Sequence, residues 1–246
     1  MREDGRLYDE LRKIHIETDY TNYAEGSVYI AFGATRLLCN VSVEERVPPF
    51  LRGTGGGWVT AEYAMLPRAT HTRMMRESVK GRASGRTMEI QRLIGRALRS
   101  IMDLKTLGER TLWIDCDVLQ ADGGTRAVAI TGAFVAVANA LATLLKKKAI
   151  KKIPLQDFIA AASVGLKNGQ PYLDLTCAED TTVSVDMNVV MTGGGKYVEV
   201  QGTGEHHPFD TDELHALLAY AKLGVDQLIT KQKEVLGPEL TELISG

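Results

Sequence analysis

The segment Asp122-Gly123-Gly124-Thr125-Arg126 lies between a predicted strand and a predicted helix. Its glycines allow backbone N–H groups to approach an anion closely, and a helix N-terminus adds unpaired N–H donors with a partial positive charge. Thr125 adds a hydroxyl and Arg126 a guanidinium that can bind two oxygens at once. The segment therefore indicates a phosphate site, although a tight strand-to-helix turn would use the same residues. The spacing of a P-loop is absent, and so is a dinucleotide fingerprint.

A second arginine, Arg86, lies at another predicted loop-to-helix junction, Gly85-Arg86-Thr87. Two arginines at two helix starts could hold one anion together. The predicted loop 67–85 before it contains one acid, Glu77, and five basic residues: Arg68, Arg73, Arg76, Lys80 and Arg82. A groove that follows an RNA backbone requires positive charge at this density. The alternative is a solvated, mobile loop.

Two carboxylates, Asp180 and Asp186, form a third candidate group. Asp186 shares one face of its predicted strand with Ser184 and Asn188, and such a set of oxygen ligands suits a hard cation such as Mg²⁺. Six residues of straight strand span about 20 Å, so one ion could meet both acids only if a turn folds Asp180 back. Residues 178–181 could form that turn. The alternative is two surface carboxylates.

Composition limits the classes of protein that the chain could be. Its 246 residues carry 29 Lys and Arg against 31 Asp and Glu, a net charge of −2, which excludes a bulk polycation. Hydrophobic residues at 44% and charged residues at 24% are typical of a folded chain. Three cysteines without CxxC spacing indicate neither a disulfide framework nor a zinc ribbon. The charged first residues do not form a signal peptide, so we expect a reduced, cytoplasmic protein.

Hydrophobic periodicity supplies the elements that must position these groups. The predicted strands are 14–17, 27–32, 36–43, 58–66, 112–118, 158–166, 172–175, 181–191 and 197–201. The predicted helices are 86–102, 127–145 and one that begins at Asp210, where Glu213 completes a capping box. Residues 127–145 are apolar almost all round, which indicates a central buried helix rather than a membrane span. Because hairpins outnumber crossovers, the order predicts an α+β fold of mixed sheets with packed helices.

Long stretches of the chain resemble the bacterial ribonuclease PH family of phosphorolytic 3′-to-5′ exoribonucleases. The resemblance runs essentially end to end, with short departures at Ala127–Ala129 and at His206-His207. The stretches that carry it are Gly26-Ser27, Phe32-Gly33, Gly57–Thr70, Gly85–Arg96, Asp115–Arg126, Val185–Thr192 and Gln201–Thr203.

The resemblance implies one domain over residues 1–246 with a ribonuclease PH-like fold, of the ribosomal protein S5 domain 2-like type. Its N-terminal part, about 1–150, would carry the phosphate loop, and its C-terminal part, about 151–246, the acidic site. The implied reaction uses inorganic phosphate to remove 3′-terminal nucleotides as nucleoside diphosphates, and its reverse adds nucleotides. The implied substrates are tRNA precursors and other RNA with free 3′ ends, so that the enzyme is a tRNA nucleotidyltransferase in tRNA and rRNA processing. The implied assembly is a homo-hexamer, a trimer of dimers.

The resemblance also assigns roles to the residues. Phosphate would be held by Arg86, Gly124, Thr125 and Arg126. Asp180 and Asp186 would lie at the site with a divalent metal such as Mg²⁺, and the catalytic set would be Asp180, Asp186 and Arg126. Whether the two acids hold the metal or donate a proton stays open. We expect Arg68, Arg73 and Arg76 to bind RNA near subunit boundaries. Two alternatives remain, a catalytically silent RNA-binding ring subunit and a hydrolytic metal-dependent exonuclease.

Overall fold

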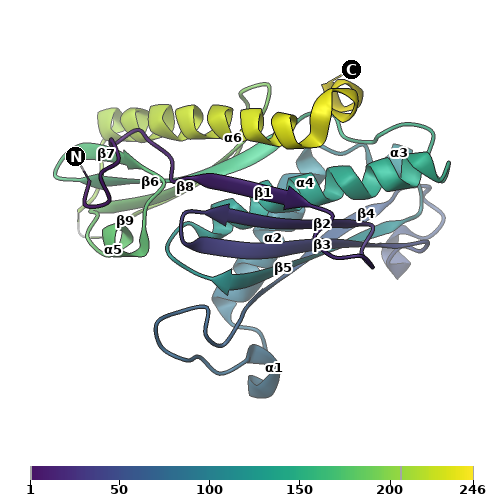
Figure 1. Cartoon of the computed structure of the whole chain (residues 1–246), viewed down its shortest axis with the longest axis horizontal. Helices are drawn as coiled ribbons and strands as arrows, with labels where there is room; N and C mark the ends of the chain where they lie inside the picture. Colours follow the sequence, from purple (N-terminus) through teal and green to yellow (C-terminus); the bar gives the residue numbers. More distant parts are fainter. Residues whose placement is uncertain (1, 206, 246) are drawn as a thin grey trace.

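The computed structural model describes residues 2–205 and 207–245 as two sheets packed around a central helix (Figure 1). The first sheet has the strand order β1-β2-β3-β5-β4 and is antiparallel except where β4 runs parallel to β5. Its strands are β1 (Ile14–Thr18), β2 (Gly26–Phe32), β3 (Thr35–Glu44), β4 (Trp58–Met65) and β5 (Thr111–Gln120). The parallel pair requires a long crossover, and residues 66–110 supply it.

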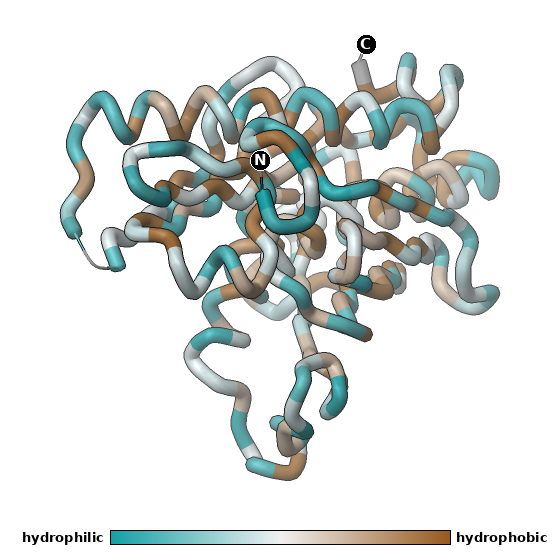
Figure 2. Tube along the Cα trace, turned by 60° about the vertical axis from the view of Figure 1, so that its left-hand side comes forward, coloured by the Kyte–Doolittle hydropathy of each residue, from teal (hydrophilic) through white to brown (hydrophobic). Residues whose placement is uncertain are grey.

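The crossover contains the helices α1 (Glu77–Lys80), α2 (Gly85–Ser100) and α3 (Leu104–Leu107), and a 3₁₀ turn, Pro49–Leu51, precedes β4. Helix α2 buries Ile90, Leu93 and Ile94 on one face, as its periodicity predicts. The segment 67–85, which we call the basic arm, leaves the body of the protein (Figures 1 and 2). It was predicted as a loop, and the structure places the single turn α1 within it.

The second sheet is antiparallel throughout, with the order β7-β6-β8-β9. Its strands are β6 (Ile159–Lys167), β7 (Gln170–Leu173), β8 (Val185–Thr192) and β9 (Tyr197–Gly204). Helix α6 (Thr211–Ser245) packs on β6 and β7. Asp210 and Glu213 exchange backbone-to-carboxylate bonds of 2.9 and 3.0 Å, which confirms the predicted capping box. Gly237, with φ at 78°, and Pro238 kink the helix near its end.

Helix α4 (Thr125–Lys146) lies between the two sheets and contacts β2, β3 and β6. It is the one described helix with the length and hydropathy to cross a membrane, but 78% of its apolar window is buried inside the protein. It is therefore the central core helix that its all-round apolar sequence predicts. Its first two residues end the segment Asp122–Arg126, which we call the phosphate loop after its predicted ligand, so the core of the fold fixes the position of this segment.

The mixed-sheet α+β prediction is confirmed, but two predicted strands are displaced. The strand expected over 172–175 lies two residues earlier, as β7 (Gln170–Leu173). The strand expected over 181–191 starts at Val185, and helix α5 (Cys177–Asp180) precedes it. A capping box causes the difference, because the Thr176 hydroxyl accepts the N–H of Glu179 while the Glu179 carboxylate accepts the N–H of Thr176. The turn that Asp180 needs in order to fold back toward Asp186 is therefore present.

Candidate functional site

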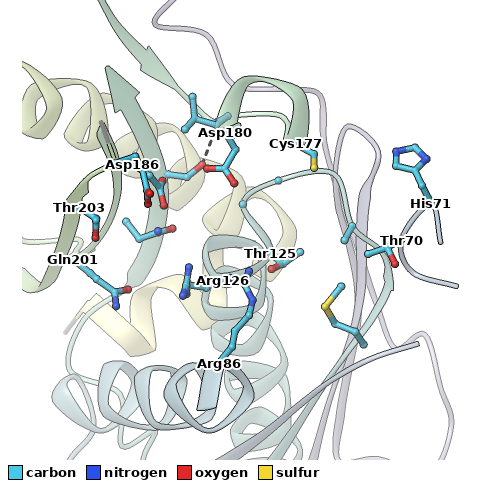
Figure 3. Close-up of a pocket in the computed structure, with 18 of the residues that line it drawn as sticks. Thr70, His71, Arg86, Thr125, Arg126, Cys177, Asp180, Asp186, Gln201 and Thr203 are labelled. Carbon is cyan, nitrogen blue, oxygen red and sulfur yellow. Dashed lines mark hydrogen bonds between the residues drawn. The ribbon is translucent and has the colours of Figure 1, made fainter. Parts of the chain in front are cut away.

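A cavity of about 620 Å³ lies where the starts of α2 and α4 meet α5, β8 and β9 (Figure 3). Its wall contains all six residues predicted for phosphate and acid chemistry. We call Arg86, Gly124, Thr125 and Arg126 the cationic wall, and Asp180 and Asp186 the acidic wall. The structure thus joins groups from three separate stretches of the sequence.

The loop that begins the cationic wall depends on two glycines in left-handed conformations. Gly123 has φ at 77° and Gly124 has φ at 66°. A Cβ on Gly123 would lie 2.3 Å from the carbonyl oxygen of Leu175, so no other residue fits there. Gly124 occupies the N-cap position of α4 and has no side chain that could cap the first N–H donors of the helix. These donors remain available to an anion in the cavity.

Two side chains of the cationic wall have fixed partners. The hydroxyl of Thr125 lies 3.0 Å from that of Tyr63, whose pKa is raised by burial and lowered less by the bond to Thr125. A terminal nitrogen of Arg126 donates to Glu89 at 2.8 Å. The Nε of Arg126 is buried and has no hydrogen-bond partner among the described residues. Leaving such a donor unpaired is unfavourable, so an acceptor brought by a ligand would improve the site.

Arg86 stands in the first turn of α2, which begins at the N-cap residue Ser84 with an N–H bond of 3.2 Å from Thr87. It points toward the same space as Arg126 (Figure 3), and it forms none of the ion pairs found within residues 2–205 and 207–245. Two guanidiniums from two helix starts therefore face one cavity, as the sequence predicts.

The acidic wall is formed by the last residue of α5 and the second residue of β8. Burial and the neighbouring charge of Asp180 raise the pKa of Asp186 to about 6, against smaller opposing effects of Arg126 and Arg86. Burial also raises the pKa of Asp180, and Arg86 and Arg126 lower it in part. Both carboxylates thus feel the two arginines across the cavity. Their ionisation is opposed by burial and by neighbouring negative charge, which comes from Asp180 at Asp186 and from Glu205 at both carboxylates.

The acidic wall suits a divalent cation only in part. Within the part of the chain that the structure describes, no group of three or more His, Cys, Asp or Glu residues could hold a metal ion. Mg²⁺, however, commonly binds through one or two carboxylates together with waters and substrate phosphates. A cation between Asp180 and Asp186 would relieve the repulsion that raises the pKa of Asp186, so this pair fits Mg²⁺ when a phosphate-bearing substrate is present.

Asn188, which the sequence groups with Asp186, lines the same cavity, together with three polar residues that the sequence did not indicate: Gln201, Thr203 and Glu205. Asn188 on β8 pairs in register with Gln201 on β9, and Asp186 pairs with Thr203. The Oε1 atom of Gln201 is buried without a hydrogen-bond partner among the described residues. The alternation of β8 places Asn188 beside Asp186, but only the register between β8 and β9 brings Gln201 and Thr203 to the cavity.

The three arginines predicted to bind RNA lie elsewhere. Arg68, Arg73 and Arg76 are exposed on the basic arm and do not line the cavity. Thr70, His71 and Met74 of the same arm do line it, so part of the arm borders the cavity. Figure 3 shows Thr70 and His71 on the side of the cavity away from the acidic wall.

Comparison with known proteins adds independent findings. Two family models match, the 3′ exoribonuclease family domain 1 over residues 10–142 and domain 2 over residues 157–223. A ribonuclease PH from Bacillus subtilis (strain 168) is 60% identical over 244 residues, 99% of this chain and 100% of the relative. A ribonuclease PH from Listeria welshimeri is 56% identical over 247 residues and covers all of both chains.

Solved structures support the fold at much lower identity. Rice (Oryza sativa) Rrp46 is 18% identical with a TM-score of 0.78, over 96% of this chain and 100% of that one. A chain of an Archaeoglobus fulgidus exosome, solved with RNA bound to the active site, is 20% identical with a TM-score of 0.80, over 94% of this chain and 92% of that one. At these identities the likeness establishes a shared fold.

Proposed function

The chain belongs to the 3′ exoribonuclease family, and from its full-length similarity to ribonuclease PH we propose that it is a phosphate-dependent 3′-to-5′ exoribonuclease. One observation carries the proposal beyond the family match. The cationic wall faces Asp180 and Asp186 of the acidic wall across a single cavity, which a third carboxylate, Glu205, also lines. Phosphoryl transfer between anions needs this pairing of positive charge for the phosphates with a separate site for the leaving oxygen.

In the proposed reaction, an oxygen of inorganic phosphate attacks the phosphorus of the last phosphodiester. A new P–O bond forms, the bond to the 3′ oxygen of the preceding nucleotide breaks, and that oxygen takes up a proton. The products are a nucleoside diphosphate and an RNA shortened by one nucleotide. The reverse reaction adds a nucleotide to the 3′ end.

The cationic wall would bind the attacking phosphate. Arg86, Arg126, the Thr125 hydroxyl and the N–H groups of Gly124 and Thr125 would hold its oxygens in line with the scissile bond. The structure supports this assignment through the uncapped start of α4 and the unpaired Nε of Arg126.

The acidic wall would act on the leaving oxygen in one of two ways. With a pKa of about 6, Asp186 is partly protonated near neutral pH and could donate a proton to the 3′ oxygen. Alternatively, Asp180 and Asp186 would be ligands of Mg²⁺, which when bound neutralises charge on the phosphoryl group. The pH dependence of kcat separates these two roles.

We extend the proposal to substrate and assembly by analogy with the relatives. The substrates would be tRNA precursors and other RNA with free 3′ ends, and the protein would form a cytoplasmic homo-hexamer arranged as a trimer of dimers. The basic arm, with Arg68, Arg73 and Arg76, would supply positive charge along the path of the RNA. Residues 1–150 and 151–246 would form the two parts of a single catalytic domain.

Product analysis tests the reaction directly. RNA with a single-stranded 3′ tail is incubated with the protein and Mg²⁺, with and without phosphate, and the released nucleotides are identified. We expect nucleoside diphosphate, released only when phosphate is present, and extension of the RNA when nucleoside diphosphate is in excess. Nucleoside monophosphate would support the hydrolytic alternative, and RNA binding without any product would support the silent subunit.

A further inference from the structure

A cluster of buried arginines near the N-terminus lies directly behind the cavity. Arg2, Arg6 and Arg12 are each at most 9% exposed, and they pair with Asp174 and Glu179, which are also buried. We call these five residues the N-terminal clamp. None of the three arginines lines the cavity, so none would touch phosphate or RNA.

Arg12 connects the clamp to the phosphate loop. Its guanidinium donates hydrogen bonds of 2.7 and 2.9 Å to the two oxygens of the Asp174 carboxylate. The same guanidinium donates to the carbonyl oxygen of Asp122 and, at 3.3 Å, to that of Gly123. The Thr35 hydroxyl donates to the Gly123 carbonyl at 2.7 Å and accepts the N–H of Asp122 at 2.9 Å. The carbonyl groups of Asp122 and Gly123 are thus both held by hydrogen bonds on the side of the loop that faces Arg12.

The planarity of the peptide bond gives these contacts a consequence for the cavity. In a trans peptide the N–H of one residue points opposite to the C=O of the residue before it. Because the Gly123 carbonyl is held toward Arg12, the N–H of Gly124 points away from Arg12. Gly124 lines the cavity, and its N–H is one of the donors that the proposed phosphate would use.

Arg2 connects the clamp to the acidic wall in a similar way. It binds both oxygens of Glu179, one of them at 2.7 Å, and donates to the carbonyls of Leu173 and Asp174 at 2.5 and 2.9 Å. Glu179 caps the first turn of α5, and Asp180 is the next residue. The bonds of Arg2 therefore fix the helix that presents Asp180.

Buried ion pairs are a costly way to hold a chain segment in place, because an apolar cluster of similar volume is often at least as stable. An apolar cluster, however, cannot hold backbone carbonyls in one direction. We propose that the N-terminal clamp positions both walls of the catalytic cavity, with Arg12 orienting the phosphate loop and Arg2 orienting α5. These are positioning residues, and the proposal rests on the phosphorolytic function proposed above.

The test uses lysine variants, which keep the charge but lose the fork that binds several oxygens at once. In Arg12→Lys we expect the KM for phosphate to rise about 10- to 100-fold while the KM for RNA stays the same. In Arg2→Lys we expect kcat to fall by about tenfold or more while the KM for phosphate stays the same. Arg6→Lys is the matched control for the phosphate readout, because Arg6 pairs with Asp174 and lies 3.8 Å from Glu179 but contacts neither loop carbonyl.

A second readout does not require turnover. The rise in melting temperature with phosphate concentration gives the phosphate affinity of each variant, and among the three arginine variants only Arg12→Lys should show a weaker affinity. If Arg12→Lys unfolds, the uncharged variant Thr35→Val removes a bond to the same Gly123 carbonyl and should also weaken phosphate binding. Equal phosphate affinity in the Arg12, Thr35 and Arg6 variants would overturn the role of Arg12. A wild-type kcat in Arg2→Lys would overturn that of Arg2.

Failure of this inference is distinguishable from failure of the proposed function. If the wild-type protein shortens RNA equally well without phosphate, the proposed function is wrong and the clamp has no phosphate loop to orient. If the wild-type protein depends on phosphate and Arg12→Lys keeps both its affinity and its KM for phosphate, only the clamp proposal is wrong.

Discussion

The cationic and acidic walls of the cavity differ in what determines their electrostatic character. The cationic wall relies on backbone geometry, with two left-handed glycines, two helix starts and two guanidiniums. In the acidic wall, burial and the repulsion between the two carboxylates raise the pKa of Asp186 to about 6. The acidic wall is therefore where protons and cations can act.

The largest expected effect comes from the acidic wall. Asp180→Asn and Asp186→Asn keep the shape of the side chain and remove its charge, so the fold and RNA binding should persist. We expect each change to lower kcat by about 10³- to 10⁴-fold, within the range of a lost general acid or base. Phosphorolysis assays and RNA binding are measured on the same preparations. Wild-type turnover in either variant would show that these carboxylates are ordinary surface groups.

The cationic wall should give a smaller but still large loss. Arg126→Ala or Arg86→Ala removes one preorganised donor from the proposed phosphate site, and we expect turnover to fall about 10²- to 10³-fold. The KM for phosphate should rise, and RNA affinity should change much less because the basic arm is intact. If Arg126→Ala abolished RNA binding and left the response to phosphate unchanged, the assignment of phosphate binding to the cationic wall would be wrong.

The two walls also differ in how predictable they were from the sequence. Asp122–Arg126 could be assigned because its glycines, threonine and arginine are adjacent, and each has a local reason to be there. The position of Asp180 depended on a turn that only the Thr176–Glu179 capping box specifies. Asp174 and Arg12 are 162 residues apart, and an ion pair at that separation leaves no local pattern. Gln201 and Thr203 required the register of β8 and β9, which hydrophobic alternation does not determine.

The free energy of unfolding should depend on pH through Asp186. The raised pKa means that folded Asp186 binds a proton more readily than the unfolded chain does. Its contribution to stability is therefore present at low pH and is lost as pH rises from about 4 through 6. At pH 7 we expect Asp186→Asn to be more stable than wild type by on the order of 1–2 kcal/mol, with the difference vanishing near pH 4. Urea unfolding at several pH values measures it, and a variant that is less stable at pH 7 would contradict the raised pKa.

The same carboxyl decides between the two roles of the acidic wall. If Asp186 donates a proton, kcat should fall as pH rises above about 6, because the protonated form is lost. If Asp186 is a ligand of Mg²⁺, activity should instead fall as pH drops below about 6, and extra Mg²⁺ should restore it. The expected change is about tenfold per pH unit along the affected limb. The residual activity of Asp186→Asn should be low and should show neither of these two pH dependences.

The smallest expected effect on chemistry lies outside both walls, in the basic arm. Arg68, Arg73 and Arg76 are exposed there and do not line the cavity. Replacing all three with glutamine should weaken RNA binding and leave kcat at saturating RNA unchanged. For single-stranded RNA, the slope of log affinity against log salt should become shallower by about two units, because each lost phosphate contact contributes about 0.7. Fluorescence anisotropy over a salt series measures this slope.

Light scattering on the same protein reports its assembly, and a fully active monomer would mean that neighbouring arms do not share one RNA path. If the triple variant lost kcat instead of affinity, the arm would belong to the catalytic site, and the separation between binding and chemistry would be wrong.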